Sequence, residues 1–128
     1  MYMPKGRSMI SGDYKIAKQR GQKGYFGRVA LDAQPTESGV QVDFDAACAS
    51  CWQSGVRFGI DYFFDHIPIV GGVRIHVVCV EGHEVDTNNA LIALAAANAL
   101  FQAFGIAESK KKPQLDEENG LVVFQCKN

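Results

Sequence analysis

Residues 90–104, ALIALAAANALFQAF, are the segment that most constrains the fold of this 128-residue chain. The segment is rich in strong helix formers, and its apolar side chains surround the helix axis almost completely. Because it is shorter than the roughly 18 residues that a membrane-spanning helix needs, it has to be covered by other elements of a domain core. We expect Asp86 or Thr87 to cap its N-terminus, and Gly105 to follow its last turn.

Alternation of apolar and polar residues predicts strands on both sides of a second helix. The strands are expected at 13–20, 28–33, 39–45 and 72–82, the first two forming a hairpin through a glycine-rich stretch. A helix is expected within 46–66, where Gly55 and Gly59 would let it sit close to a neighbouring backbone. The order βββαβα predicts an α+β fold, a two-layer sandwich of two helices on one sheet.

Composition and length predict a single domain over residues 1–128. With 47% apolar and 21% charged residues, the chain is typical of a globular domain with a core. We place the core at about 13–105, a charged loop at 107–119, and a short C-terminal strand at 120–126 that could join the edge of the sheet. The N-terminus has too short an apolar stretch for a signal peptide, so we expect a cytoplasmic protein without a membrane partner.

The cysteines raise the question of redox or metal chemistry. Cys48 and Cys51 form a CxxC motif near the expected start of the first helix, where a thiolate would be stabilised. A zinc site needs about four ligands, and the other candidates do not form a second close pair: Cys79, Cys126, His66, His76. Small buried thiols, with neither a metal nor a disulfide at Cys48 and Cys51, are therefore the favoured interpretation.

Patterns typical of catalysis are absent from the sequence. There is no Ser/His/Asp order, no pair of catalytic carboxylates, no HExxH motif, and no GxxxxGK[ST] loop for a nucleotide. We therefore expect a protein that is not an enzyme and that needs no cofactor, metal or nucleotide.

Basic residues are concentrated at the N-terminal end of the chain. The net charge is only −1, but residues 1–28 carry +6, which leaves −7 for residues 29–128. The stretch KQRGQKGYFGR, residues 18–28, combines four cations that can neutralise phosphates with two aromatic rings that can stack on an unpaired base: Lys18, Arg20, Lys23, Arg28, Tyr25, Phe26. The alternative is a glycine-rich hairpin whose basic side chains are only solvated.

The same stretch resembles the opening hairpin of domain IV of the bacterial translocase, elongation factor G. That family shows the pattern K-x-x-[RK]-Q-x-G-x-[RK]-G-x-[YF]-G-x-V. The chain fits it without a gap at nine positions: Lys15, Lys18, Gln19, Gly21, Lys23, Gly24, Phe26, Gly27, Val29.

A second segment, residues 73–104, resembles the strand, tip loop and helix of the same domain. The family signature H-x-V-D-[ST] is met by His83, Val85, Asp86 and Thr87. The two segments together extend the resemblance over about residues 13–105. The segment AACASCWQSG, at 46–55, departs from the family, which puts in doubt any surface that the family forms there.

The resemblance implies a fold like the second domain of ribosomal protein S five, with a left-handed βαβ crossover. In the family a further domain begins near a P-x-L-x-E stretch, which Pro113, Leu115 and Glu117 resemble. Because the sequence ends soon after this stretch, we expect a stand-alone tip domain. The resemblance also implies that loops 20–27 and 81–86 lie side by side. Arg20, Lys23 and His83 would then form one cationic tip, opposite the acidic rest of the chain.

The function implied by the resemblance is that of a ribosome- or RNA-associated protein without a GTPase. His83 matches the tip histidine of the family, so it joins the expected RNA-binding residues. The partner would be the ribosome or another structured RNA. The alternative is a protein-interaction module that retains only the fold and binds a protein partner.

Overall fold

The computed structural model describes residues 9–48, 50–69, 71–106 and 111–125. The elements follow one another as strands β1 (Ile10–Arg20), β2 (Lys23–Thr36) and β3 (Val40–Phe44), helix α1 (Gln53–His66), strand β4 (Gly72–Glu81), helix α2 (Asn89–Ala103), and strands β5 (Gln114–Asp116) and β6 (Leu121–Val123). A short 3-10 turn, Ser50–Trp52, precedes α1. The order βββαβα of the core is therefore confirmed.

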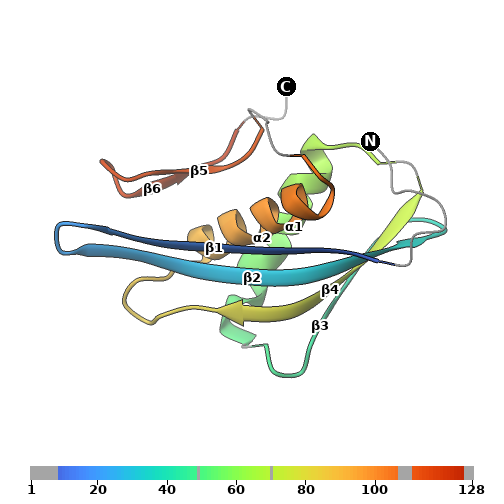
Figure 1. Ribbon diagram of the computed structural model, residues 1–128, viewed down its shortest axis with the longest axis horizontal. Coiled ribbons are helices and arrows are strands. Elements are labelled where there is room, and N and C mark those ends of the chain that lie inside the picture. Colours follow the sequence, from blue (N-terminus) through green and yellow to red (C-terminus); the bar gives the residue numbers. More distant parts are fainter. Residues whose placement is uncertain (1–8, 49, 70, 107–110, 126–128) are drawn as a thin grey trace.

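Four strands form one sheet in the order β1-β2-β4-β3. The pairs β1–β2 and β2–β4 are antiparallel, whereas β3 and β4 are parallel and are connected through α1. Both helices lie on the same face of the sheet, as Figure 1 shows, so the predicted two-layer α+β sandwich is confirmed. The left-handed sense of the β3–α1–β4 crossover stays a prediction.

Helix α2 is buried on nearly all sides, as its sequence predicts. Every residue from Leu91 to Phe101 is buried, because α2 packs on the sheet, against α1 and beneath the C-terminal strands β5 and β6. The two helices approach closely where a Cβ on Gly55 would lie 2.8 Å from the carbonyl oxygen of Asn89. A Cβ on Gly59 would collide with the carbonyl of Ala93, so the expected role of these two glycines is confirmed.

The ends of α2 correct one expectation and confirm another. The N-cap is Asn88, whose side-chain oxygen accepts a hydrogen bond of 2.9 Å from the backbone N–H of Leu91. The prediction that Asp86 or Thr87 caps the helix is therefore wrong. Gly105, at φ 73°, follows the C-cap residue Phe104 in the left-handed conformation that glycine adopts readily.

The C-terminal part of the chain differs from the expected loop and edge strand. Strand β5 lies inside the region expected to be a charged loop, and β6 pairs with β5 rather than with the main sheet. The resulting hairpin lies on the helix side of the sheet, and its turn points in the same direction as the β1–β2 turn (Figure 1). Residues 107–110 and 126–128 of the expected loop and strand lie outside the described residues. In the described part of the chain, neither helix is long and apolar enough to cross a membrane.

Candidate nucleic-acid interface

The glycine-rich stretch of the sequence forms the end of a long hairpin. β1 and β2 pair continuously from Ile10 opposite Ala33 to Arg20 opposite Lys23, so most of residues 18–28 are strand. The chain reverses at Gly21, which has φ 60°, and no atom of the described residues lies within 4 Å of the place that a Cβ would take. The hairpin extends past the ends of α2 and β4 (Figure 1), and its end therefore forms a projecting tip.

The loop between β4 and α2, residues 82–88, is held against β2 by hydrogen bonds, and we call this attachment the lock. The backbone N–H of Phe26 donates to the carbonyl oxygen of Asp86 at 2.9 Å. The buried hydroxyl of Thr87 donates to the carbonyl oxygen of Phe26 at 2.7 Å and accepts from the N–H of His83 at 2.6 Å. The expectation that loops 20–27 and 81–86 lie side by side is confirmed. Asp86 and Thr87 act in this lock instead of capping α2.

The lock brings two aromatic rings into a parallel stack. The rings of Phe26 and His83 have centroids 4.0 Å apart and planes within 2° of each other. His83 is exposed and Phe26 is partly exposed on the uncovered face of the sheet. The Lys15 ammonium lies 6.0 Å from the centroid of the Phe26 ring. A stacked pair with a cation beside it is a surface that an unpaired base can extend by stacking.

Arg28, which the sequence analysis assigned to phosphate binding, is held by carboxylates. Its guanidinium donates to both carboxylate oxygens of Asp13, at 3.0 and 2.7 Å, and also contacts Glu81. These hydrogen bonds raise the pKa of Arg28 above its usual range and lower the pKa values of the Asp13 and Glu81 carboxyls. Because two carboxylates compensate its charge, Arg28 supports the sheet, and its contact with a phosphate stays a prediction.

Tyr25 is also unavailable, because the C-terminal hairpin covers it. Its side chain is only 5% exposed, in a cluster of apolar residues beneath β5 and β6. The expectation that Tyr25 stacks on an unpaired base is therefore wrong for this structure. Its position in the alternating pattern predicts that it points to the helix side, but the sequence does not show that a second hairpin lies there.

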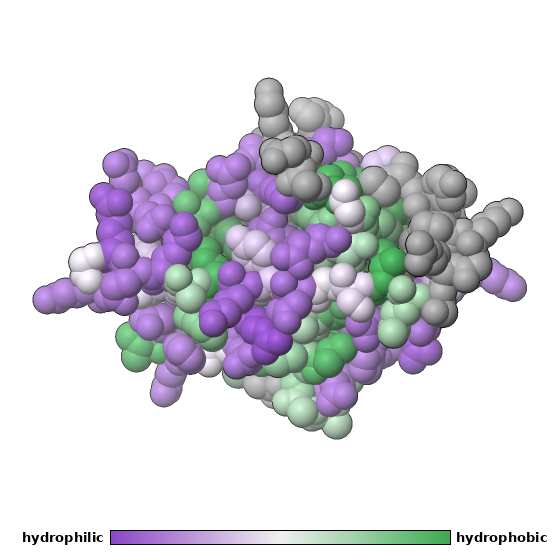
Figure 2. Space-filling model, viewed as in Figure 1, coloured by the Kyte–Doolittle hydropathy of each residue, from purple (hydrophilic) through white to green (hydrophobic). Residues whose placement is uncertain are grey.

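The other cations of the tip face carboxylates of the C-terminal hairpin. The Lys18 ammonium lies 3.4 Å from a carboxylate oxygen of Glu117. Arg20 and Lys23 are exposed, and with Glu117 and Glu118 they border a hollow of about 440 Å³ between the two hairpins. The hydrophilic side chains at this end of the molecule are visible in Figure 2. The expectation of a cationic tip opposite an acidic remainder is wrong, because acidic residues lie at the tip itself.

The two cysteines of the CxxC motif lie in different surroundings. Cys48 is buried in the loop before the 3-10 turn, and its Sγ lies 3.5 Å from the carbonyl oxygen of Val77. Burial raises the pKa of the Cys48 thiol, so its reactive thiolate is disfavoured. Both cysteines are free thiols, but Cys51 is exposed, so the expectation of a buried thiol is wrong at that position. The motif precedes α1 instead of opening it, and Cys126 lies outside the described residues.

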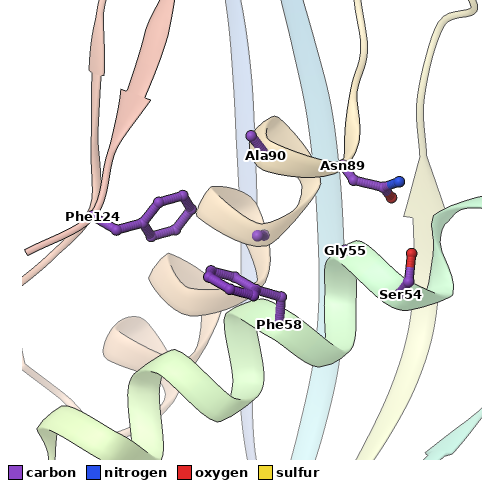
Figure 3. A pocket seen from close by; sticks show the side chains of 7 residues that line it. Ser54, Gly55, Phe58, Asn89, Ala90 and Phe124 are labelled. Carbon is purple, nitrogen blue, oxygen red and sulfur yellow. The ribbon is translucent and has the colours of Figure 1, made fainter.

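A second hollow lies between the two helices and carries no ionisable group. Its volume is about 330 Å³, and Figure 3 shows the rings of Phe58 and Phe124 forming one wall. The remaining lining residues are small or neutral: Ser54, Gly55, Asn89, Ala90, Ala93. Phe58 is 54% exposed, so this hollow opens onto an apolar part of the surface. It has the character of a contact surface for an apolar group, without acid–base chemistry.

Three features of the tip escaped the sequence analysis. Lys15 is in the matched pattern, but its place beside the Phe26 ring follows from the register of β1 on β2. The two carboxylates that pair with Arg28 belong to different strands, Asp13 to β1 and Glu81 to β4. Glu117 and Glu118 lie 94 to 98 residues away from Arg20 and Lys23 in the sequence, and no local pattern brings them together.

Comparison with known proteins supports the fold. No protein-family model matches this chain. A crystal structure of a protein from Thermus thermophilus is similar, with a TM-score of 0.63 and 24% sequence identity over 80% of this chain. The matched region is 16% of that protein's length, so this chain corresponds to about one sixth of it. The similarity shows a shared fold.

Proposed function

We propose that this protein associates with the ribosome or another structured RNA, and that it binds RNA through the tip of the β1–β2 hairpin. The observation that carries the proposal is that the loop between β4 and α2, residues 82–88, is hydrogen-bonded to Phe26 of β2. It places the stacked rings of Phe26 and His83 on the same projecting tip as two exposed cations, Arg20 and Lys23. Stacking on unpaired bases and neutralisation of phosphates are the two interactions that bind single-stranded RNA segments.

The residues proposed to contact RNA are fewer than the sequence suggests. Arg20 and Lys23 contact phosphates, His83 and Phe26 stack on an unpaired base, and Lys18 contributes when its pair with Glu117 opens. Lys15 is added beside the rings. The resemblance of both tip segments to domain IV of elongation factor G supports the same surface. The role is that of a binding protein without a GTPase and without a catalytic step.

Sedimentation with ribosomes and fluorescence anisotropy with a labelled single-stranded RNA, each at low and raised salt, test the proposal. We expect R20A/K23A to weaken binding and to lower the salt slope by about one to two units, at about 0.7–0.9 per lost phosphate contact. The control is R57A/R74A, which removes the same charge from α1 and from the far end of β4. Equal losses in both double variants, or no salt-sensitive binding by the wild type, would contradict the proposal.

A protein-interaction module is the second candidate function. The apolar hollow between α1 and α2 and the exposed Phe58 beside it favour this alternative. Under it, F58A would abolish capture of a protein partner, while R20A/K23A would leave that capture unchanged. Pull-down from native lysate, with sequencing of the retained RNA and mass spectrometry of the retained proteins, distinguishes the two candidates.

A further inference from the structure

The C-terminal hairpin is attached to the helix side of the tip by apolar contacts. Leu115 of β5 and Val122 of β6 pack against a cluster that spans β1, β2 and α2: Ile16, Tyr25, Leu91, Leu94. The residues that flank the hairpin are fixed to the helices. The Asn98 side chain donates to the carbonyl oxygen of Pro113 at 3.5 Å, and the N–H of Gln125 donates to the Tyr62 hydroxyl at 2.9 Å. The β5–β6 hairpin is thus held at its base, and its turn extends toward the tip.

The turn of this hairpin presents carboxylates in an ordered arrangement. Asn119 donates to both carboxylate oxygens of Asp116, at 3.3 Å from its backbone N–H and 2.8 Å from its side chain. These hydrogen bonds lower the pKa of the Asp116 carboxyl, and the charge of Arg20 acts in the same direction. Gly120 closes the turn at φ 67°, and a Cβ there would lie 3.3 Å from the Tyr25 hydroxyl.

The carboxylates of the turn meet the same cations that the proposed function assigns to RNA phosphates. Glu117 pairs with Lys18, and the hollow between the hairpins is bordered on one side by Arg20 and Lys23 and on the other by Glu117 and Glu118. The side chains of Lys18 and Glu117 are 52% and 33% exposed, so water and salt screen this pair. Such a pair can be exchanged for a phosphate without breaking the core.

We propose that the β5–β6 turn is an internal competitor for RNA, with Glu117 and Glu118 occupying the place of RNA phosphates on the helix side of the tip. This inference rests on the proposed function. RNA has to displace the turn to reach Lys18, Arg20 and Lys23 from that side, whereas the Phe26–His83 stack on the uncovered face is not competed for. RNA that supplies an unpaired base as well as phosphates therefore binds better than a plain duplex. The competitor makes the tip selective for single-stranded segments.

The test compares E117Q/E118Q with D61N/D65N, which removes the same charge from exposed positions of α1. The probes are a labelled 12-nucleotide oligouridine and a 12-base-pair RNA duplex. We expect E117Q/E118Q to bind both probes about three- to tenfold more tightly at low salt, and to narrow the preference for the single strand. Its salt slope should be steeper by about one unit, since cations freed from carboxylates gain phosphate contacts. The control should change affinity less than twofold.

Hydrogen exchange of the wild-type protein provides a second, independent measurement. If RNA displaces the turn, amides at 116–120 should exchange faster when oligouridine is bound, while those of the loop 82–88 exchange more slowly. Slower exchange in both segments, 116–120 and 82–88, would overturn the proposal that the turn competes with RNA. Equal affinities of E117Q/E118Q and D61N/D65N would also overturn it, while R20A/K23A-sensitive binding would leave the proposed function standing. Failure of the wild type and all variants to bind either probe would overturn both.

Discussion

Two segments, loop 82–88 and the β5–β6 turn at 116–120, flank the same hairpin and are attached to it by different forces. The loop is fixed by the buried hydroxyl of Thr87 and by one backbone hydrogen bond, from the N–H of Phe26 to the carbonyl oxygen of Asp86. The strands that carry the turn are anchored by apolar contacts, but the turn itself meets the tip through an exposed ion pair between Lys18 and Glu117. Breaking the first leaves buried polar groups unsatisfied, whereas water and salt replace the second at little cost. The loop is therefore a permanent part of the site, and the turn is exchangeable.

The largest effect is expected from removing the hydroxyl that locks the loop. Thr87→Val should lower the free energy of unfolding by about 2–3 kcal/mol, because the N–H of His83 and the carbonyl of Phe26 both lose a buried partner. Urea denaturation measures this loss. Thr36→Val is the matched control, since the buried Thr36 hydroxyl has no hydrogen-bond partner among the described residues. A similar loss in both variants would show that the Thr87 hydrogen bonds do not hold the loop.

Removing one ring of the stack should have a smaller effect. His83→Ala is expected to lower the free energy of unfolding by about 0.5–1.5 kcal/mol, the usual contribution of an aromatic pair. RNA affinity should fall about three- to tenfold with little change in salt slope at pH 7.5, because the variant removes a stacking surface and no phosphate contact. Anisotropy titrations at several salt concentrations measure both quantities. A salt slope that falls as in R20A/K23A would assign His83 to phosphate binding instead.

Acid should loosen the internal hydrogen bonds of the turn, between Asp116 and Asn119, and leave the loop in place. The folded-state pKa of Asp116 lies below its ordinary value of 3.8, so the contribution of this carboxylate is fully present above that value and is lost as pH falls through the lowered pKa. The lock of loop 82–88 uses a hydroxyl and backbone groups, which do not titrate in this range. Nuclear magnetic resonance between pH 5 and 2 should show the amide of Asn119 shifting before that of Phe26. Simultaneous shifts would contradict the separation of the two attachments.

The smallest effect is expected from the exposed ion pair. Glu117→Gln should change the free energy of unfolding by less than about 0.5 kcal/mol, because the paired side chains of Lys18 and Glu117 are 52% and 33% exposed and water screens their charges. The change should vanish at 0.5 M salt, where charges at the surface are screened. Thermal and chemical denaturation at two salt concentrations measure this. A loss above about 1 kcal/mol at high salt would mean that the turn is a structural part of the tip.

Those parts of the site that depend on local sequence patterns could be predicted. The alternation of residues along β1 and β2 predicted the hairpin, whereas the position of loop 81–86 beside it was implied by the resemblance to domain IV of elongation factor G. The roles within the loop were not predicted, since Thr87 was expected to cap α2 and instead bridges His83 and Phe26. A hydroxyl serves equally well in either role, and only the position of β2 decides between them.

The sequence by itself determined the order βββαβα of the core and the burial of α2, because these follow from periodicities within about 20 residues, and it placed cations and aromatic rings at 18–28. Only the tertiary structure decided which of those cations remain available. Arg28 is held by Asp13 and Glu81 from neighbouring strands, and Lys18 meets Glu117 from a separate hairpin. The sequence states which residues are charged. Whether an opposite charge lies within a few ångströms of them depends on which distant segments are brought together by the packing of apolar surfaces.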